Sequence, residues 1–461
     1  MRGPFKGWYD AIGRRLDPQD KLLIRNSSWI LSSNLFVALL AFLKSIVVAR
    51  GLGPELFGTY VLMAALALTV IELLDVNAGV TVIKFGAEYH GENRLDKIVA
   101  LVKCIVLTSA GLGVAAVGAL ALVLVLFYDA LIGVPGYEAL IVLYGAVAVV
   151  AYLDSLSLGL LRLFYKFKIN AAVKGIAGLV DLAVSVAVLA AFPHQLKPFF
   201  IAMIATRGVS SLVLNAAATI ELWPFFRPHL GAPVAVLRGA GRGILSFALS
   251  TSGSSTLNRL RNQGDKLLLG AVAGAQQVAY YEIAKKLAQS CLRLTDPLRL
   301  TIYPQLANLV AARRFDEVAR LVKRVSILFA IPALLAILTG VFLGHAAVSL
   351  LYGPAFVQAV PALIVYLVIV ALDLSLFWLV SLMNSVGKAK ELFSVNLVTL
   401  ILLVPIAFVA VQAWGALGMA LAMLVTKVGS SGVLLALCRG ALTRSAAPEA
   451  PGRAVSAAEK V

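Results

Sequence analysis

Apolar stretches of about 20 residues recur along almost the whole chain, and this repetition constrains the fold more than any other feature. A helix of that length is what a chain needs to cross the hydrocarbon core of a bilayer. Of the 461 residues, 61% are hydrophobic and only 14% are charged. A soluble protein of this size cannot bury so much apolar surface. The sequence therefore predicts an all-α polytopic membrane protein.

The apolar stretches predict about twelve transmembrane helices, with Gly and Pro in the connections between them. The predicted spans are 27–49, 59–82, 100–127, 138–161, 168–192, 199–221, 243–271, 277–303, 322–344, 357–384, 390–411 and 415–438.

The distribution of basic residues predicts the orientation of these spans. Of the 40 Lys and Arg residues, those in loops lie almost entirely in the N-terminal segment, the even-numbered loops and the C-terminal tail. The odd-numbered loops contribute Arg50 and Lys197. Loops rich in Lys and Arg stay in the cytoplasm. We therefore expect a multi-pass protein of the cell membrane, plasma or inner, with both termini cytoplasmic and an uncleaved first span.

The two halves of the chain resemble each other. ALIV at 139–142 recurs at 362–365, and GPELFGTY at 53–60 aligns with GAQQVAYY at 274–281, at offsets of 223 and 221. Six spans separate equivalent segments, so the halves predict two parallel, pseudo-symmetric six-helix lobes. The predicted parts are a cytoplasmic N-terminal segment 1–26, an N-lobe 27–221, an inter-lobe cytoplasmic linker 222–242, a C-lobe 243–438 and a disordered cytoplasmic tail 439–461.

The seventh predicted span carries a polar stripe. Ser250–Leu269 reads STSGSSTLNRLRNQGDKLLL, and at 100° per residue its small polar side chains share one face with Arg259 and Lys266. A cation at the centre of a bilayer costs about 2.5–3.5 kcal/mol. We therefore expect Arg259 and Lys266 to face a water-filled cavity and to bind substrate.

Further charged residues lie inside the predicted spans, and cations outnumber acids there. Lys44 and Arg207 have no acid four residues away, which favours a role in binding; Lys285 is a weaker candidate, since of the consecutive pair Lys285–Lys286 only one can point into a cavity. Glu72 and Asp75, three residues apart in the second span, are consistent either with binding a coupling cation or with pairing to the basic residues.

Nothing in the sequence indicates an enzyme. It has no nucleotide-binding loop, no zinc-protease motif and no nucleophile elbow, and its odd-numbered loops are too short for an external catalytic domain. The three Cys residues are far apart and give no metal spacing. Since the basic residues follow the ends of the spans, they indicate membrane topology and do not predict nucleic-acid binding. We expect no catalytic residue, no metal and no cofactor.

The chain resembles the polysaccharide flippases of bacteria and archaea, in the multidrug/oligosaccharidyl-lipid/polysaccharide (MOP) exporter superfamily. The resemblance lies in LKSIVVARGLGPELFGTYVLMAAL (43–66), LLDVNAGVTVIKFGAEYHGEN (73–93), GDKLLLGAVAGAQQVAYYEIAKKL (264–287), YPQLANLVAARRFDEVARLVKR (303–324) and VSLLYGPAFVQAVPAL (348–363). It implies that the protein moves an isoprenoid-linked oligosaccharide (undecaprenyl or dolichyl phosphate type) across a membrane by alternating access, for surface polysaccharide or glycan synthesis. The partners would then be this substrate and membrane lipids, and we expect the protein to function as a monomer.

Three other functions remain to be weighed against this one. A cation-coupled multidrug exporter of the same superfamily would attract cations, which a basic cavity repels. Lipid II flippases of the superfamily have two more C-terminal spans than the twelve predicted here, which disfavours a peptidoglycan precursor. A structural subunit of a glycan-synthesis complex would have no need for buried charge.

Overall fold

The computed structural model describes residues 18–75, 77–293 and 296–446, and every secondary-structure element within these ranges is a helix. The chain divides into two compact units, Met1–Ala279 (unit 1) and Tyr280–Val461 (unit 2). Part of the predicted N-terminal segment, residues 1–17, and part of the predicted tail, residues 447–461, lie outside the described residues.

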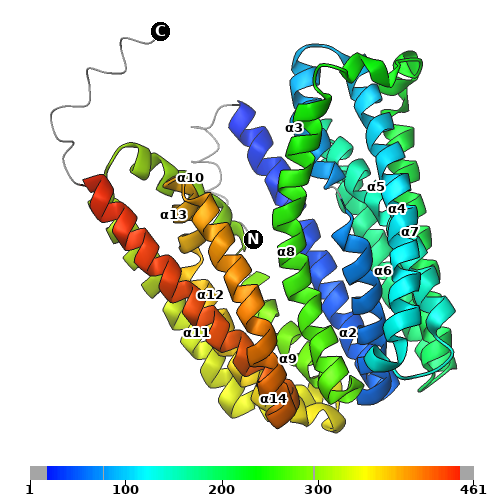
Figure 1. Cartoon of the computed structure of the whole chain (residues 1–461), viewed down its shortest axis with the longest axis vertical. Coiled ribbons are helices and arrows are strands. Elements are labelled where there is room, and N and C mark those ends of the chain that lie inside the picture. The colour runs from blue at the N-terminus through cyan, green and yellow to red at the C-terminus, as the bar shows by residue number, and fades with distance from the viewer. Residues whose placement is uncertain (1–17, 76, 294–295, 447–461) are drawn as a thin grey trace, which may run out of the picture. The chain divides into compact units, whose positions relative to one another are not determined.

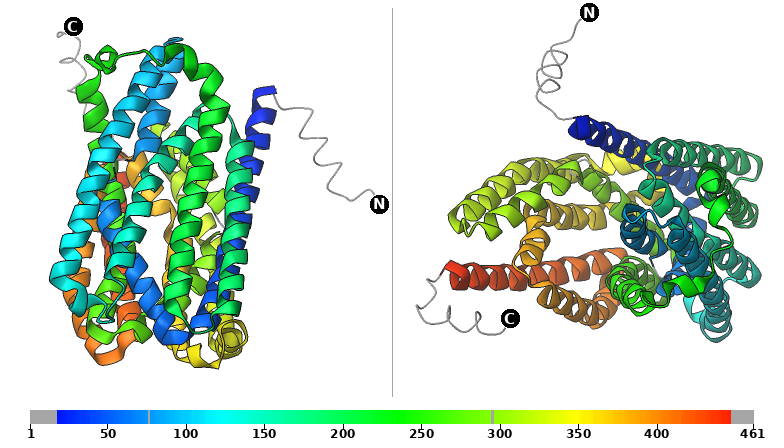
Figure 2. Two further views of the ribbon diagram at one scale, coloured as in Figure 1. Left: turned by 90° about the vertical axis from the view of Figure 1, so that its right-hand side faces the viewer. Right: turned by 90° about the horizontal axis from the view of Figure 1, so that it is seen from above.

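Unit 1 is a bundle in which the helices lie side by side (Figures 1 and 2). Its long helices are α2 (Pro18–Leu73), α3 (Ala78–Gly91), α4 (Leu95–Leu131), α5 (Glu138–Leu163), α6 (Phe167–Ala191), α7 (Leu196–Phe226) and α8 (Gly241–Ala273). Helix α2 packs against α6 and α8, and α5 packs against α3 and α7. Between α7 and α8, the predicted linker forms the short 3-10 helices η1 (Arg227–His229) and η2 (Val234–Leu237), and Leu237 is buried.

Unit 2 begins within α9 (Ala275–Arg293) and continues with further helices (Figure 1). These are α10 (Asp296–Ala311), α11 (Phe315–Tyr352), η3 (Pro354–Ala359), α12 (Val360–Leu376), α13 (Trp378–Ser385) and α14 (Ala389–Ala446). The α11 helix packs against α12, and α12 packs against α14. Because α14 continues to Ala446, residues 439–446, which the sequence assigned to the tail, are helical.

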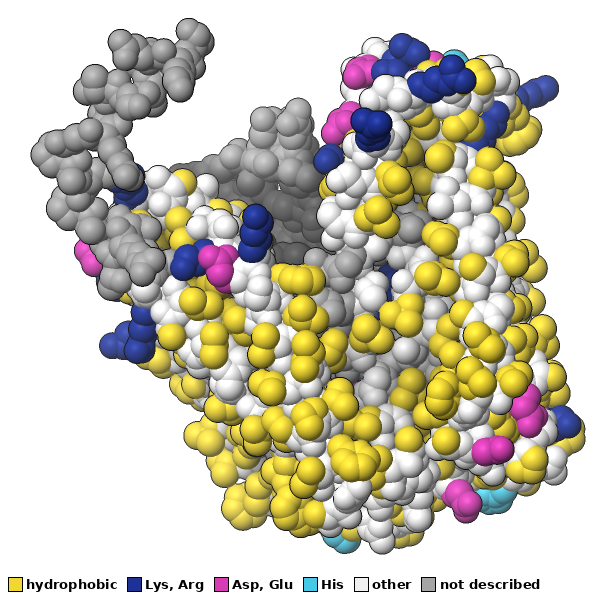
Figure 3. Space-filling view, viewed as in Figure 1, with side chains coloured by type: hydrophobic (Ala, Val, Ile, Leu, Met, Phe, Trp, Pro, Cys, Tyr) yellow, Lys and Arg dark blue, Asp and Glu magenta, His cyan; other side chains and the backbone are white. Residues whose placement is uncertain are grey.

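The helices expose apolar side chains along their length, as lipid-facing helices do. Val125 of α4 is 83% exposed and Phe342 of α11 is 77% exposed. Over unit 1, charged side chains gather near the two ends of the helices, and hydrophobic ones cover most of the length between (Figure 3). Eight described segments are long and apolar enough to cross a membrane, and two of them, Ser32–Gly91 and Lys390–Gly440, are long enough to cross twice. The chain is therefore a multi-pass membrane protein.

The two halves share their backbone turns, which supports the predicted duplication. Gly53 and Gly274 have nearly the same dihedral angles (φ 77, ψ 172 and φ 85, ψ 173) and lie 221 residues apart. Three more pairs of residues with positive φ recur at offsets of 220, 222 and 221: Asn93 and Arg313, Tyr165 and Gly387, His194 and Gly415.

The turns at Tyr165 and Gly387 also make the same hydrogen bonds. After α5, the amide of Tyr165 donates to Arg162 and that of Lys166 donates to Leu161; after α13, Gly387 donates to Asn384 and Lys388 donates to Met383. This pattern is the Schellman motif, which satisfies the last carbonyl groups of a helix. The fold predicted from the sequence, two related six-helix halves, is confirmed.

Two predicted spans are interrupted within the described residues, which their apolar composition did not predict. The span predicted at 59–82 is split between α2 and α3. The span at 357–384 is split at Phe377, where Ser326 of α11 donates to the carbonyl oxygen of Ser375 at 2.8 Å. Apolar composition gives the length of a span but does not show where its helix breaks. The predicted lobe boundaries follow chain order and stay a prediction, since the compact units follow packing and place α8 with unit 1.

Candidate functional site

The candidate site is built around the break between α2 and α3. Helix α2 ends at Leu73, and Asn77, with left-handed dihedral angles (φ 46, ψ 48), begins α3. The local sequence is Asp-Val-Asn-Ala-Gly, and Asp and Asn side chains compete with the helical ladder for backbone hydrogen bonds. A break at this point frees backbone groups that lipid cannot satisfy, so other helices must supply partners.

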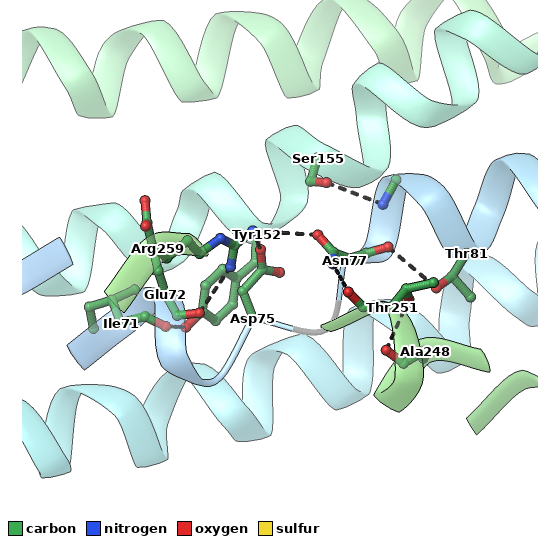
Figure 4. Close-up of polar contacts among 11 residues, drawn as sticks. Ile71, Glu72, Asp75, Asn77, Thr81, Tyr152, Ser155, Ala248, Thr251 and Arg259 are labelled. Atoms are coloured by element: carbon green, nitrogen blue, oxygen red, sulfur yellow. Dashed lines mark hydrogen bonds and ion pairs between the residues drawn. The ribbon is translucent and has the colours of Figure 1, made fainter. Parts of the chain in front are cut away.

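Side chains from two helices cover the freed carbonyl groups at the end of α2 (Figure 4). The Tyr152 hydroxyl of α5 donates to the carbonyl oxygen of Ile71. The guanidinium of Arg259, from α8, donates through Nη1 to the carbonyl oxygen of Glu72 at 2.9 Å. On the other side of the break, Ser155 Oγ of α5 accepts the amide of Gly79 at 3.2 Å. Irregular backbone inside the bundle is thus held by fixed polar partners.

Arg259 also makes an ion pair across the break. Its Nη2 lies 2.7 Å from Oδ2 of Asp75 and 3.4 Å from Oδ1 of Asn77. Asn77 in turn donates from Nδ2 to the carbonyl oxygen of Thr251 on α8 at 3.1 Å. Helix α8 therefore contacts both sides of the break, through Arg259 and through Thr251 (Figure 4).

Arg207 of α7 has no such partner. Its Nε is buried and makes no hydrogen bond to the described residues, and its guanidinium lies over the Tyr144 ring, 5.7 Å from the centroid. On the neighbouring α5, the carboxylate of Asp154 accepts hydrogen bonds from Ser211 (2.6 Å) and Asn215 (2.8 Å). Arg207 is thus a cation among apolar helices with an unsatisfied buried donor.

Lys44 is paired between helices. Its Nζ lies 2.7 Å from Oδ2 of Asp181 on α6, and the two side chains are 15% and 31% exposed. No acid lies four residues from Lys44 in the sequence; its partner Asp181 comes from α6, 137 residues further along the chain. Lys44 and Asp181 also interact electrostatically with Tyr144, the residue beneath Arg207.

Glu72 connects several of the predicted site residues. Its carboxyl group interacts electrostatically with Arg259, Arg207 and Lys266, and with the neighbouring Asp75. The structure therefore brings five predicted residues into one group within unit 1: Glu72, Asp75, Arg207, Arg259 and Lys266. Lys44 joins the same region through Tyr144.

The charges of this group are more balanced than the sequence suggested. Two of its cations, Lys44 and Arg259, are in ion pairs with Asp181 and Asp75. Cations outnumber acids in the predicted spans as a whole, but around the break these two cations have acidic partners. Within the group, Arg207 is the cation whose buried donor lacks an acceptor among the described residues.

Lys285 lies in unit 2. It is 7% exposed, and its Nζ lies 5.6 Å from the centre of the Tyr281 ring. Its neighbour Lys286 is 40% exposed and lies 3.3 Å from Glu282 on the same helix. Of the two consecutive lysines, Lys285 is thus the buried one. Elsewhere in unit 2, Lys427 of α14 pairs with Asp373 of α12.

The sequence did not indicate the roles of the residues that organise the break and the ion pairs, namely Asn77, Tyr144, Tyr152 and Asp181. Only Asn77 had a local signal, since Asp-Val-Asn-Ala-Gly in the middle of an apolar span is a turn sequence. Within the described residues, no group of three or more His, Cys, Asp or Glu side chains could hold a metal ion.

Comparison with known proteins places these features in context. Residues 23–310 match the family model described as polysaccharide biosynthesis protein. The amylovoran biosynthesis protein AmsL of Erwinia amylovora is 30% identical over 157 residues, which cover 32% of this chain. The chain spans 39% of the length of that relative.

Solved structures share the fold. The lipid II flippase MurJ in an inward closed conformation superposes with a TM-score of 0.66 at 11% identity, over 90% of this chain and 89% of that one. A MATE transporter of Vibrio cholerae, VcmN in its bent form, gives 0.56 at 14% identity over 92% and 98%. A MOP superfamily transporter from Pyrococcus furiosus, described as having a binding pocket of reverse polarity, gives 0.60 at 16% identity over 94% and 98%.

Proposed function

Because this chain belongs to the polysaccharide biosynthesis protein family, we propose that it is a flippase that moves an isoprenoid-(pyro)phosphate-linked oligosaccharide from the cytoplasmic to the outer leaflet by alternating access. The resemblance to polysaccharide flippases of the MOP superfamily, stated from the sequence, is confirmed at the level of family and fold. The substrate would serve surface polysaccharide or glycan synthesis, on an undecaprenyl or dolichyl carrier. We further propose that the protein acts as a monomer in the plasma or inner membrane, with both termini cytoplasmic.

The observation that carries the proposal is Arg207. A cation held among apolar helices is costly unless it is paired and hydrogen-bonded. Its buried Nε donor lacks an acceptor among the described residues, while the carboxylate of Asp154 is already hydrogen-bonded by Ser211 and Asn215. A phosphate oxygen would satisfy this donor. An organic cation would instead be repelled, which disfavours the multidrug-exporter alternative.

The other predicted residues would contribute to substrate binding in different ways. Arg207 and Lys266, which both interact with Glu72, would bind the phosphate group. Arg259 would join them when Asp75 turns away from it. Lys44 would contribute positive potential through its pair with Asp181, and Lys285 stays a candidate substrate ligand. Glu72 and Asp75 would be structural partners of the cations and would not bind a coupling ion.

Replacing Arg207 tests this proposal. In reconstituted vesicles with a fluorescent isoprenoid-linked oligosaccharide, we expect Arg207→Ala to slow flipping about tenfold to hundredfold, since a charge-assisted contact to phosphate contributes about 1.5–3 kcal/mol. Arg207→Lys should recover part of the rate, because a point charge still attracts phosphate but lacks the fork geometry. Lys390→Ala, at an exposed lysine of α14, is the matched control and should flip at the wild-type rate. Normal flipping by Arg207→Ala would remove Arg207 from the mechanism.

The membrane potential should assist transport. No nucleotide-binding motif is present in the sequence, and an inside-negative potential favours outward movement of a phosphate group by about 2.3 kcal/mol per charge per 100 mV. After the substrate has been released, the same potential also favours movement of the empty cationic side chains back toward the cytoplasm. We expect flipping in vesicles to slow when the potential is collapsed with a potassium ionophore at constant pH and sodium gradients. If flipping ignores the potential but stops in Glu72→Gln, ion exchange through that carboxylate is the better account.

A further inference from the structure

We propose that Asp75 determines which lipid headgroup binds Arg259. Its carboxylate is bound to the guanidinium and competes with incoming ligands, so that only a headgroup with more negative charge than a phosphodiester displaces it. The proposal rests on the proposed function, because it concerns how the phosphate group of that substrate is selected.

The contact between the two residues is weak for an arginine–carboxylate pair. A guanidinium and a carboxylate can form two parallel hydrogen bonds, and that arrangement is the strong one. Here Oδ2 of Asp75 accepts a hydrogen bond from Nη2 at 2.7 Å, and Oδ1 is buried without a hydrogen-bond partner among the described residues. Arg259 donates its other hydrogen bonds to the carbonyl oxygen of Glu72 and to Oδ1 of Asn77. A ligand that offers two oxygens and more negative charge than Asp75 can therefore replace it with a better arrangement.

The position of the pair allows such an exchange. The Arg259 side chain is 25% exposed, so a ligand can reach it, whereas Asp75 is 11% exposed. Asp75 lies in the link after Leu73 and before Ala78, outside both helices. Its side chain can turn away without breaking a helical ladder. Arg259 stays in place because it is on α8 and still caps α2 through Glu72.

The chemistry of the bilayer explains why a competitor is useful. Phospholipids with one negative charge on a phosphodiester surround any flippase, and an unguarded guanidinium would bind them. A carboxylate on the same chain competes at a high effective concentration, with its entropy of association already lost. A phosphodiester can also offer two oxygens to the fork of Arg259, but it brings only the charge of Asp75 and must pay the entropy of association that Asp75 has already lost. A diphosphate offers the same two oxygens together with at least one more negative charge.

The experiment measures competition between two lipids in nanodiscs that hold the full-length protein. Farnesyl diphosphate is the probe, and its affinity is compared in phosphatidylcholine and in an equal mixture with phosphatidylglycerol. The wild type should bind the probe almost equally in both. In Asp75→Asn, which keeps an oxygen for Arg259 but removes the charge, phosphatidylglycerol should weaken probe binding about tenfold or more, the factor expected for one charge-assisted contact.

Two further variants make the outcome specific. Asp75→Glu keeps the negative charge and should keep the wild-type insensitivity to phosphatidylglycerol. Asp373→Asn removes the acid of the Lys427 ion pair in unit 2 and is the matched control, which should also behave as wild type. If Asp75→Asn is as insensitive as the wild type, or if Asp373→Asn is equally affected, Asp75 does not select the headgroup, while the proposed function stands. If the wild type fails to bind farnesyl diphosphate in either lipid, both the proposed function and this inference are overturned.

Discussion

An Arg259→Ala variant is expected to lose transport and a large part of its stability. The change removes the donor to the Glu72 carbonyl oxygen and leaves Asp75 with neither a counter-ion nor a hydrogen bond to its carboxylate. Breaking a buried pair by removing one partner costs about 3–5 kcal/mol, because the other charge stays uncompensated. The thermal unfolding midpoint in detergent and the flipping rate in vesicles measure the two effects.

A second substitution separates the structural role of Arg259 from its role in transport. In the double variant Arg259→Ala with Asp75→Ala, no buried charge is left alone, so most of the lost stability should return. Transport should not return, because the guanidinium is still missing. If the double variant flips substrate at the wild-type rate, Arg259 acts only by neutralising Asp75, and its assignment as a substrate ligand is wrong.

A Gly58→Ala variant is expected to yield little folded protein. A Cβ atom on Gly58, in α2, would lie 1.8 Å from the carbonyl oxygen of Ala275 at the start of α9. This neighbour is backbone, so no rotation of a side chain relieves the clash, and the helix ends must move apart. Overpacking of this kind costs about 1–3 kcal/mol or more. Fluorescence-detected size-exclusion chromatography over a temperature series gives the yield and the melting point.

The control for Gly58→Ala is the same substitution in α4. A Cβ on Gly111 has no atom within 4 Å, so Gly111→Ala should be neutral or stabilising by up to about 1 kcal/mol through helix propensity. A wild-type yield and melting point for Gly58→Ala would show that α2 and the start of α9 are not in close backbone contact in the membrane.

The sequence predicted the all-helical, multi-pass fold because each span carries its own apolar signal. It also singled out the cations that lie within the predicted spans. It could not predict their partners, because Asp75 and Arg259 are 184 residues apart and Lys44 and Asp181 are 137 residues apart. Such pairs depend on the rotation and depth of two different helices, which no local pattern contains. Arg207 and Lys44 looked alike in the sequence, yet among the described residues Lys44 has an ion-pair partner and Arg207 does not.

The break in the second span shows a different limit. Its turn sequence, Asp-Val-Asn-Ala-Gly, was visible, but the apolar residues on both sides favoured one continuous helix. The deciding factor is a set of hydrogen bonds from α5 and α8, which satisfy the backbone groups at the interruption and so stabilise it inside the bundle. Local sequence suggests a break, and only tertiary contacts stabilise it.

Because the two halves share their turns, equivalent positions in the two halves can be compared as if one were a substituted form of the other. Tyr165 and His194 adopt left-handed dihedral angles at positions where the second half has Gly387 and Gly415. A left-handed conformation costs a residue with a side chain about 1–2 kcal/mol, and glycine avoids that cost. After duplication, the first copy has therefore accepted side chains that the second copy does without. When the first half of each homologous chain is aligned with its own second half, the alignments should show which of these turns accept other residues and which must keep glycine.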